Sequence, residues 1–212
     1  MLITDRDLLA LEPDLFRDVG FLAQRLINAT GSITSGKLNI TGGDFAAAGV
    51  SAGHVVVHGS QPLEITLRNS ATQVNVSLLR VRTDDPPINP PNAGAAAAVV
   101  FTFAPQIAAA HAGLLLMLGL PEAGTGAFGE VDETAITNPG ELRMLETLLA
   151  LRTIWAAAGA VGGAGSSAAA RAEQYRLRAA HERSCVRARL DLDGDGVPDA
   201  ERRAGAGVFV RR

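Results

Sequence analysis

The stretch GSITSGKLNITGGDFAAAGVSAGHVVVHGSQPLEITLRNSATQVNVSLLRVR, residues 31–82, decides the fold expected of this 212-residue chain. Apolar and polar residues alternate along it, Val, Ile and Thr are abundant, and glycines interrupt it at short intervals. Alternation with a period of two places successive side chains on opposite faces of a strand. The pattern predicts a small antiparallel sheet or barrel, with strands over 32–34, 37–41, 53–58, 62–68 and 73–81.

Helical periodicity is found on both sides of this β segment. Upstream, leucines and Val19 recur every three or four residues, which predicts a helix over 5–27 that Pro13 interrupts. Downstream, residues 83–94 contain four prolines and predict an extended linker. Further helices are expected from Pro105 to about Leu118, from the capping box that begins at Asn138, and over about 168–189.

These elements predict an α+β chain that is mainly helical. We expect a helical bundle core, a small antiparallel β domain inserted after the first helix, and an extended C-terminal tail. The expected divisions are the N-terminal helix of the core, the β domain, a Pro/Ala-rich linker, the helical core, and an Asp-rich loop with a docking tail, over residues 1–27, 28–82, 83–98, 99–190 and 191–212.

Composition excludes several classes of protein. Cys185 is the only cysteine, so neither an intrachain disulfide nor a thiol-rich zinc site is expected. The N-terminus lacks the pattern of a secretory signal. The apolar stretch over 93–120 is interrupted by Pro105 and His111, so we expect a buried helix and no membrane partner. The net charge of −3 argues against a general nucleic-acid binder, although arginines crowd the chain from Arg171 onward.

The stretch RLDLDGDGVPDAER, residues 189–202, concentrates carboxylates and resembles an EF-hand calcium loop. Gly196 occupies the sixth position, where the loop turns sharply, but Arg202 replaces the bidentate glutamate of the twelfth. The sequence leaves two interpretations open: a weak calcium site, or a solvated turn that ends the preceding helix. The candidate ligands are the residues at the oxygen-donating positions of the loop: Asp191, Asp193, Asp195, Val197 and Asp199.

Other motifs carry less information. GSITSGKL, residues 31–38, nearly matches a phosphate-binding loop but has Leu38 where a hydroxyl residue is required, and we interpret it as a hairpin turn. His54 and His58 lack a third metal ligand nearby and are expected to be polar positions on a half-solvated sheet. No pair of acid and base with catalytic spacing is evident.

Three segments together resemble a known family. An N-terminal helix precedes the β segment with ITGGDFAAAGVSAGHVVV, and a helix pair follows as LRMLETLLALRTIWAAA and ARAEQYRLRAAHERSCVRARLDLDGDGVPDAERR. The helix centred on Tyr175 and running into the DxDGDG loop is the most characteristic part. In this arrangement the chain resembles the head–tail adaptor (connector) proteins of tailed bacteriophages.

The resemblance implies a non-catalytic structural protein of the virion neck that is assembled in the bacterial cytoplasm. Such proteins form rings, commonly of twelve identical subunits, below the portal protein, and genomic DNA passes through the ring. The opposite side of the ring receives a stopper or tail-tube protein. No cofactor is required, and calcium is the one candidate ligand.

The resemblance also implies roles for two groups of residues. The C-terminal segment is expected to engage the portal through Val208, Phe209, Val210, Arg211 and Arg212. Arginines of the last helix could face DNA or an acidic partner, the candidates being Arg176, Arg183 and Arg187. The alternative, which we favour for most of them individually, is a solvated helix face with Glu173 and Glu182 as local partners. The alternative function is a calcium-dependent protein-interaction module without catalytic activity, which rests on the aspartate loop alone.

Overall fold

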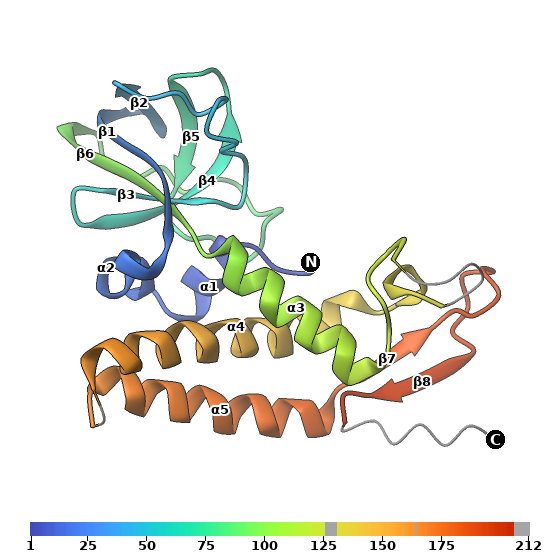
Figure 1. Ribbon diagram of the computed structural model, residues 1–212. Coiled ribbons are helices and arrows are strands. Elements are labelled where there is room, and N and C mark those ends of the chain that lie inside the picture. Colours follow the sequence, from blue (N-terminus) through green and yellow to red (C-terminus); the bar gives the residue numbers. More distant parts are fainter. Residues whose placement is uncertain (126–130, 164, 206–212) are drawn as a thin grey trace. The chain divides into compact units, whose positions relative to one another are not determined.

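The computed structural model of the protein describes residues 1–125, 131–163 and 165–205. The chain forms two compact units (Figure 1). The barrel unit comprises Thr4–Ala104, and the helical unit comprises Met1–Ile3 together with Pro105–Arg212. The expectation of a mainly helical bundle is wrong, because the chain contains a closed six-stranded antiparallel barrel, and the residues that the structure describes are 38% helix and 27% strand.

The six strands of the barrel unit close in the order β1-β2-β5-β4-β3-β6, with every neighbouring pair antiparallel. Apolar side chains such as Ile33, Leu63 and Val100 alternate inward and form its core. Five of the strands come from the predicted β segment and its flanks. The strand bounds are β1 (Gln24–Thr34), β2 (Lys37–Thr41), β3 (Val55–His58), β4 (Gln61–Arg68), β5 (Gln73–Ser77) and β6 (Ala93–Thr102).

Strand β6 corrects the predicted linker. Residues 93–98 were expected to be part of an extended linker, and 99–102 part of the helical core, but all belong to a strand that pairs with both β1 and β3. Alanine is depleted in strands, so local preference gave no signal here. The small side chains fit where the barrel wall is tight: a Cβ added at Gly31 would lie 2.8 Å from Leu38 Cδ1 and 3.2 Å from Ala98 Cβ.

The N-terminal helix is also shorter than predicted and belongs to the other unit. The segment 5–27 divides into α1 (Asp5–Leu11), α2 (Leu15–Asp18), the 3₁₀ turn η1 (Gly20–Leu22) and the start of β1, all within the barrel unit. The regular leucine spacing is therefore shared between two helices and a strand. Phe16 packs edge-on against Phe103 at the end of β6, with ring centroids 5.3 Å apart.

A buried ion cluster joins α1 to the barrel. Glu64 on β4 is 1% exposed and accepts from Arg6 Nε at 3.1 Å and from Arg80 Nε at 2.8 Å. Arg6 Nη2 also donates to the backbone oxygen of Arg80 at 2.5 Å. A buried charge is costly unless it is paired. The two guanidinium groups pair with the Glu64 carboxylate at once and so stabilise it in the buried position.

The helical unit contains α3 (Ala104–Leu118), the 3₁₀ turn η2 (Glu133–Ala135), α4 (Pro139–Gly162) and α5 (Ser167–Cys185). Helices α4 and α5 pack along each other (Figure 1). They approach closely at Gly159, where an added Cβ would lie 3.0 Å from Ala169 Cα. Helix α4 begins at Pro139 as predicted, but the Asn138 side chain bonds to Glu141 Oε2 instead of capping a helix amide.

Helix α4 is long and apolar enough to cross a bilayer by length and composition. In the protein, 61% of its most apolar 18-residue window is buried, which is the environment of a core helix.

Candidate functional site

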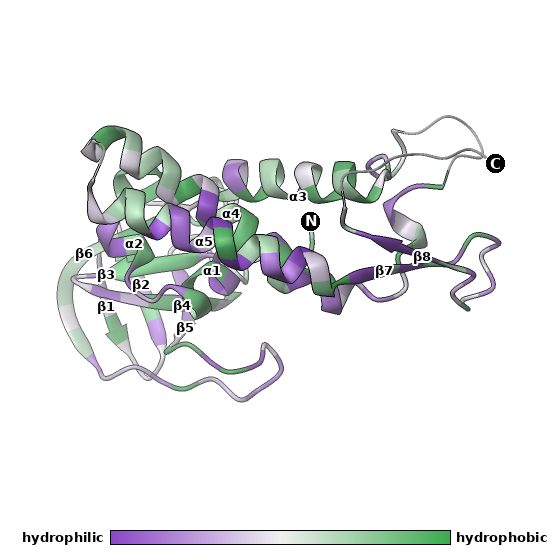
Figure 2. Cartoon of the chain, turned by 90° about the horizontal axis from the view of Figure 1, so that it is seen from below, coloured by the Kyte–Doolittle hydropathy of each residue, from purple (hydrophilic) through white to green (hydrophobic). Residues whose placement is uncertain are grey.

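The aspartate stretch is the loop of a β-hairpin. Helix α5 ends at Cys185, four residues before its predicted end, and the chain continues as β7 (Arg187–Leu190) and β8 (Ala200–Arg203), which pair antiparallel. Strand β8 is predominantly hydrophilic in Figure 2, whereas β7 alternates exposed arginines with the buried Ala188 and Leu190. Their arginine-rich sequence hid the alternation of buried and exposed residues from Val186 to Leu190. The loop 191–199 therefore joins two strands, and the expected change from helix to extended tail does not occur here.

The hairpin is held to the helical unit along β7. Ile136 forms a β-bridge with Leu190, and Asp191 N donates to Ala135 O at 2.9 Å. The Asn138 side chain, just before α4, donates to Arg187 O at 2.9 Å and accepts from Arg189 N at 2.8 Å. Asn138 thus satisfies two backbone groups of β7.

Strand β8 is anchored to α3. Arg202 Nη1 donates to Leu118 O at 3.1 Å and to Gly119 O at 2.8 Å, at the C-terminal end of α3. A cation is favourable there because the helix end carries unpaired carbonyls and partial negative charge. Arg202 occupies the position where an EF-hand has its bidentate glutamate, and the structure gives it this anchoring contact.

The loop itself brings three of the predicted ligands together. One carboxylate oxygen from each of Asp191, Asp193 and Asp195 lies within 4.8 Å of the others. Backbone amides of the loop donate to these side chains: Gly196 N to Asp191 Oδ2 at 2.8 Å, Asp195 N to Asp193 Oδ1 at 3.2 Å, and Val197 N to Asp195 Oδ1 at 2.7 Å. Backbone hydrogen bonds hold the pKa of Asp191 below its usual value, the largest from the amide of Gly196 and a smaller one from that of Gly194. Desolvation opposes this lowering.

Of the two remaining predicted ligands, Asp199 has another contact, and Val197 has no side-chain oxygen that could bind a cation. Asp199 Oδ2 accepts from Leu192 N at 2.8 Å, which ties the two ends of the loop together. Val197 could contribute only its backbone carbonyl. Oxygen atoms are the ligands that calcium prefers, so the three clustered aspartates are the part of the prediction that the geometry favours.

The predicted DNA-facing arginines do not form one open patch. Arg176 is paired with Glu173 at 2.7 Å, and Arg187 with Glu201 at 2.9 Å. Arg183 lies in the last turn of α5 and is exposed. The expected portal-binding residues, Val208, Phe209, Val210, Arg211 and Arg212, lie outside the described residues.

Two features of the helical unit were missed by sequence reasoning. The first is a buried cluster in which His111 on α3 lies between two carboxylates, with Nδ1 3.2 Å from Glu146 Oε2 and Nε2 2.5 Å from Glu133 Oε2. Glu146 also accepts from Leu2 N at 3.2 Å. Burial raises the pKa of Glu133. The opposing effects, of which the hydrogen bond with His111 is the largest, nevertheless hold that pKa below its usual value.

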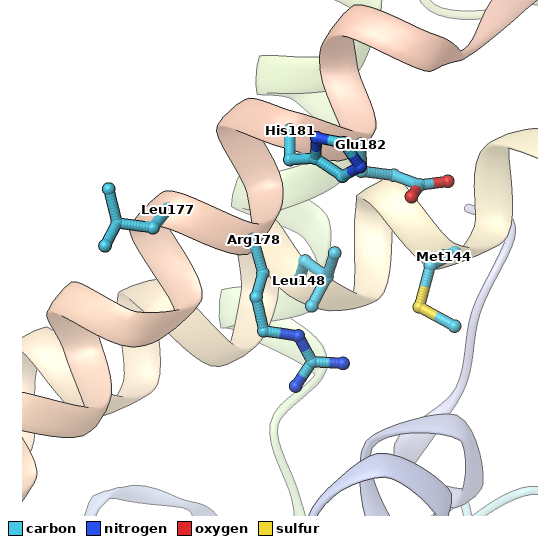
Figure 3. A pocket seen from close by; sticks show the side chains of 6 residues that line it. All are labelled: Met144, Leu148, Leu177, Arg178, His181 and Glu182. Carbon is cyan, nitrogen blue, oxygen red and sulfur yellow. The ribbon is translucent and has the colours of Figure 1, made fainter.

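The second is an apolar groove of about 430 Å³ between α4 and α5 (Figure 3). Leu148 is buried at 2% exposure, whereas Met144 and Leu177 are 45% and 55% exposed. Leu177 lies between two arginines in the sequence, so the repeat of apolar residues that predicted this helix did not point to it. The groove is lined by Met144, Leu148, Leu177, Arg178, His181 and Glu182.

Comparisons of the chain with protein-family models, with curated proteins and with solved structures found no match.

Proposed function

We propose that the protein is a structural component of a tailed-phage virion, a head–tail adaptor without catalytic activity. In this proposal identical subunits form a ring, of twelve copies, below the portal protein in the virion neck. Genomic DNA passes through the ring, and a stopper or tail-tube protein attaches to it.

The observation that carries this proposal is the clamped hairpin at the end of α5. Tyr175 is 4% exposed and fixes the middle of α5, with the Arg178 guanidinium 5.5 Å from its ring centroid. The helix then leads into a hairpin held by Asn138 on one strand and by Arg202 on the other. An element ordered before it meets its partner loses less conformational entropy on docking. A fixed hairpin supports a docking role for this end of the chain.

The test is assembly with the portal protein encoded beside this gene. We expect neighbouring genes for portal, major capsid and tail proteins, and ring-shaped particles in negative-stain images of the protein mixed with its portal. Cryo-electron microscopy of the assembled neck would then give the ring symmetry. A protein that stays monomeric with portal present, or a locus without phage structural genes, contradicts the proposal.

A calcium-dependent interaction module is the second candidate, and the clustering of Asp191, Asp193 and Asp195 favours it. A divalent cation would remove the repulsion between these carboxylates. All of them are at least partly exposed, and Arg202 replaces the strongest EF-hand ligand, so we propose binding in the millimolar range.

Calorimetric titration tests the loop directly. We expect binding heat when calcium reaches millimolar concentration with the unaltered protein, and none with Asp193→Ala. Asp84→Ala removes an exposed carboxylate outside the loop and should leave the heat unchanged. Equal heats for the unaltered protein and Asp193→Ala, or no heat in either, would leave only a solvated turn. Calcium-dependent binding to a protein other than portal would favour the second candidate over the first.

A further inference from the structure

Three segments of the helical unit meet at the side chain of His111. His111 on α3 is 4% exposed, Glu146 on α4 is fully buried, and the side chain of Glu133, the first residue of η2, is 24% exposed. The two carboxylates contact different nitrogens of the ring, with Glu146 at Nδ1 and Glu133 at Nε2. They therefore do not converge on one point, as the ligands of a metal ion would.

The His111 cluster, formed by these three residues, is satisfied only when it holds an extra proton. An ionised carboxylate can only accept hydrogen bonds, and a neutral imidazole has one N–H and one lone pair. With both carboxylates ionised, a neutral ring would turn its lone pair toward one of them. Two acceptors would then face each other in a buried environment, which is costly. The imidazolium form instead donates to both carboxylates at once.

The other polar groups that face the cluster do not replace this proton. The amide of Leu2 donates to Glu146 Oε1 at 3.2 Å, and the amide of Ala123 donates to Glu133 Oε1 at 3.4 Å. The amino group of Met1 acts on Glu133 electrostatically. Helix α3 has no ionisable side chain besides His111. Among the described residues, His111 is thus the titratable group that bridges the two carboxylates.

The turn η2 continues directly into the segment that holds the β7–β8 hairpin. The backbone oxygen of Ala135, at the end of η2, accepts from Asp191 N at 2.9 Å, and Thr137 N donates to Arg189 O at 2.9 Å. This segment is fixed at one end by the start of α4 and at the other by the contact of Glu133 with His111. Loss of that contact would free the η2 end of the segment.

We propose that His111 is a proton-dependent latch that holds η2, and through it the β7–β8 hairpin, on the helical unit. When the ring loses its extra proton, the remaining N–H stays with Glu146, because a fully buried carboxylate cannot regain hydrogen bonds from water. Glu133 is partly exposed, so its carboxylate turns to solvent and η2 loosens. The latch goes beyond the adaptor function and does not depend on it.

The latch is closed within a limited range of pH. The contribution of the imidazolium is present at low pH and is lost as the pH rises through the near-neutral range in which imidazoles titrate. The pKa of Glu133 lies below its usual value, so its contribution is present above about pH 4.5 and is lost as the pH falls further. Rising pH should therefore release the hairpin.

Amide hydrogen exchange followed by NMR tests the latch on the protein alone. Protection factors, which correct for the intrinsic pH dependence of exchange, are compared at about pH 5.5 and about pH 8.5, on either side of imidazole titration. We expect the amides of Asp191 and Thr137 to lose about tenfold in protection at the higher pH, since one charged hydrogen bond is released. The amide of Val76 in the barrel, which donates to Gly36 O at 2.8 Å, should keep its protection.

Two variants separate the latch from general effects of pH. His111→Gln cannot titrate, and Glu133→Gln offers Nε2 either an acceptor or a donor, so in both the hairpin should be equally protected at the two pH values. His181→Gln, at an exposed histidine of α5, is the matched control and should keep the tenfold change.

Equal protection at both pH values in the unaltered protein would overturn the latch, and so would a pH change that persists in Glu133→Gln. The second variant decides the matter if His111→Gln does not fold, because the Glu133 side chain is partly exposed. Each of these results is independent of whether the protein forms rings with portal, so the latch and the adaptor function fail separately.

Discussion

Replacing Glu64 by alanine is expected to destabilise the barrel unit by about 3–5 kcal/mol, the cost of breaking a buried ion pair by removing one partner. Glu64 is 1% exposed and lies between the guanidinium groups of Arg6 and Arg80. Without it, two positive charges remain close together in a buried environment. Urea unfolding followed by far-ultraviolet circular dichroism measures the loss.

Two comparisons separate this effect from a general loss of charge. Asp18→Ala removes a carboxylate of the same unit whose pair with Arg17 is exposed, and should cost about 0–1 kcal/mol. Replacing Arg6, Glu64 and Arg80 together by apolar residues of similar size should recover part of the stability, because no guanidinium group of the cluster is left unpaired, although Asp7 loses its ion pair with Arg6 at 3.5 Å. A Glu64→Ala variant no less stable than Asp18→Ala would contradict the prediction.

Replacing Glu146 by alanine is expected to destabilise the helical unit by about 3 kcal/mol, since buried polar groups would lose their partner. Glu146 is fully buried, and its carboxylate contacts both His111 Nδ1 and the amide of Leu2. Trp155, the only tryptophan, lies on the same helix, so its fluorescence during urea unfolding reports on this unit.

The matched control is Glu141→Ala on the same helix. The Glu141 side chain is 56% exposed, accepts from Asn138 Nδ2 at 2.9 Å and lies 3.8 Å from Arg189, so its removal should cost about 1 kcal/mol. Glu146→Gln keeps an acceptor for Leu2 N and should fall between the two. Equal unfolding midpoints for the Glu146→Ala and Glu141→Ala variants would show that the cluster does not stabilise the unit.

The predictable part of the fold is the part in which side-chain pattern and local preference agree. Alternating Val, Ile and Thr residues gave strands close to β2, β4 and β5, and Pro139 marked the start of α4. Strand β6 could not be predicted because alanine favours helices, and its strand conformation comes from pairing with β1 and β3. The leucine spacing before residue 27 was compatible with one long helix, and only the tertiary structure divides it.

The candidate site was predictable in its residues but not in its setting. The spacing of Asp191, Asp193 and Asp195 indicated a cation loop, and these carboxylates do lie close together. The hairpin around the loop could not be foreseen, since it depends on contacts of Asn138 and Arg202 with distant backbone groups. The α4–α5 groove was also missed, because a groove is a property of two packed helices and not of either sequence alone.

The closed barrel also constrains the order of events during synthesis of the chain. Strand β1 must pair with β6, so that Gln24 lies opposite Thr102, and no shorter piece of the chain can complete the ring of strands. Contacts between residues so distant in sequence slow folding, because the loop-closure entropy is lost before the contacts form. The edge of β1 that pairs with β6, a row of backbone N–H and C=O groups, therefore stays unpaired while the ribosome adds the next seventy or so residues. Pulse-labelling hydrogen exchange should accordingly find β1 and β6 protected together, and later than the β4–β5 pair.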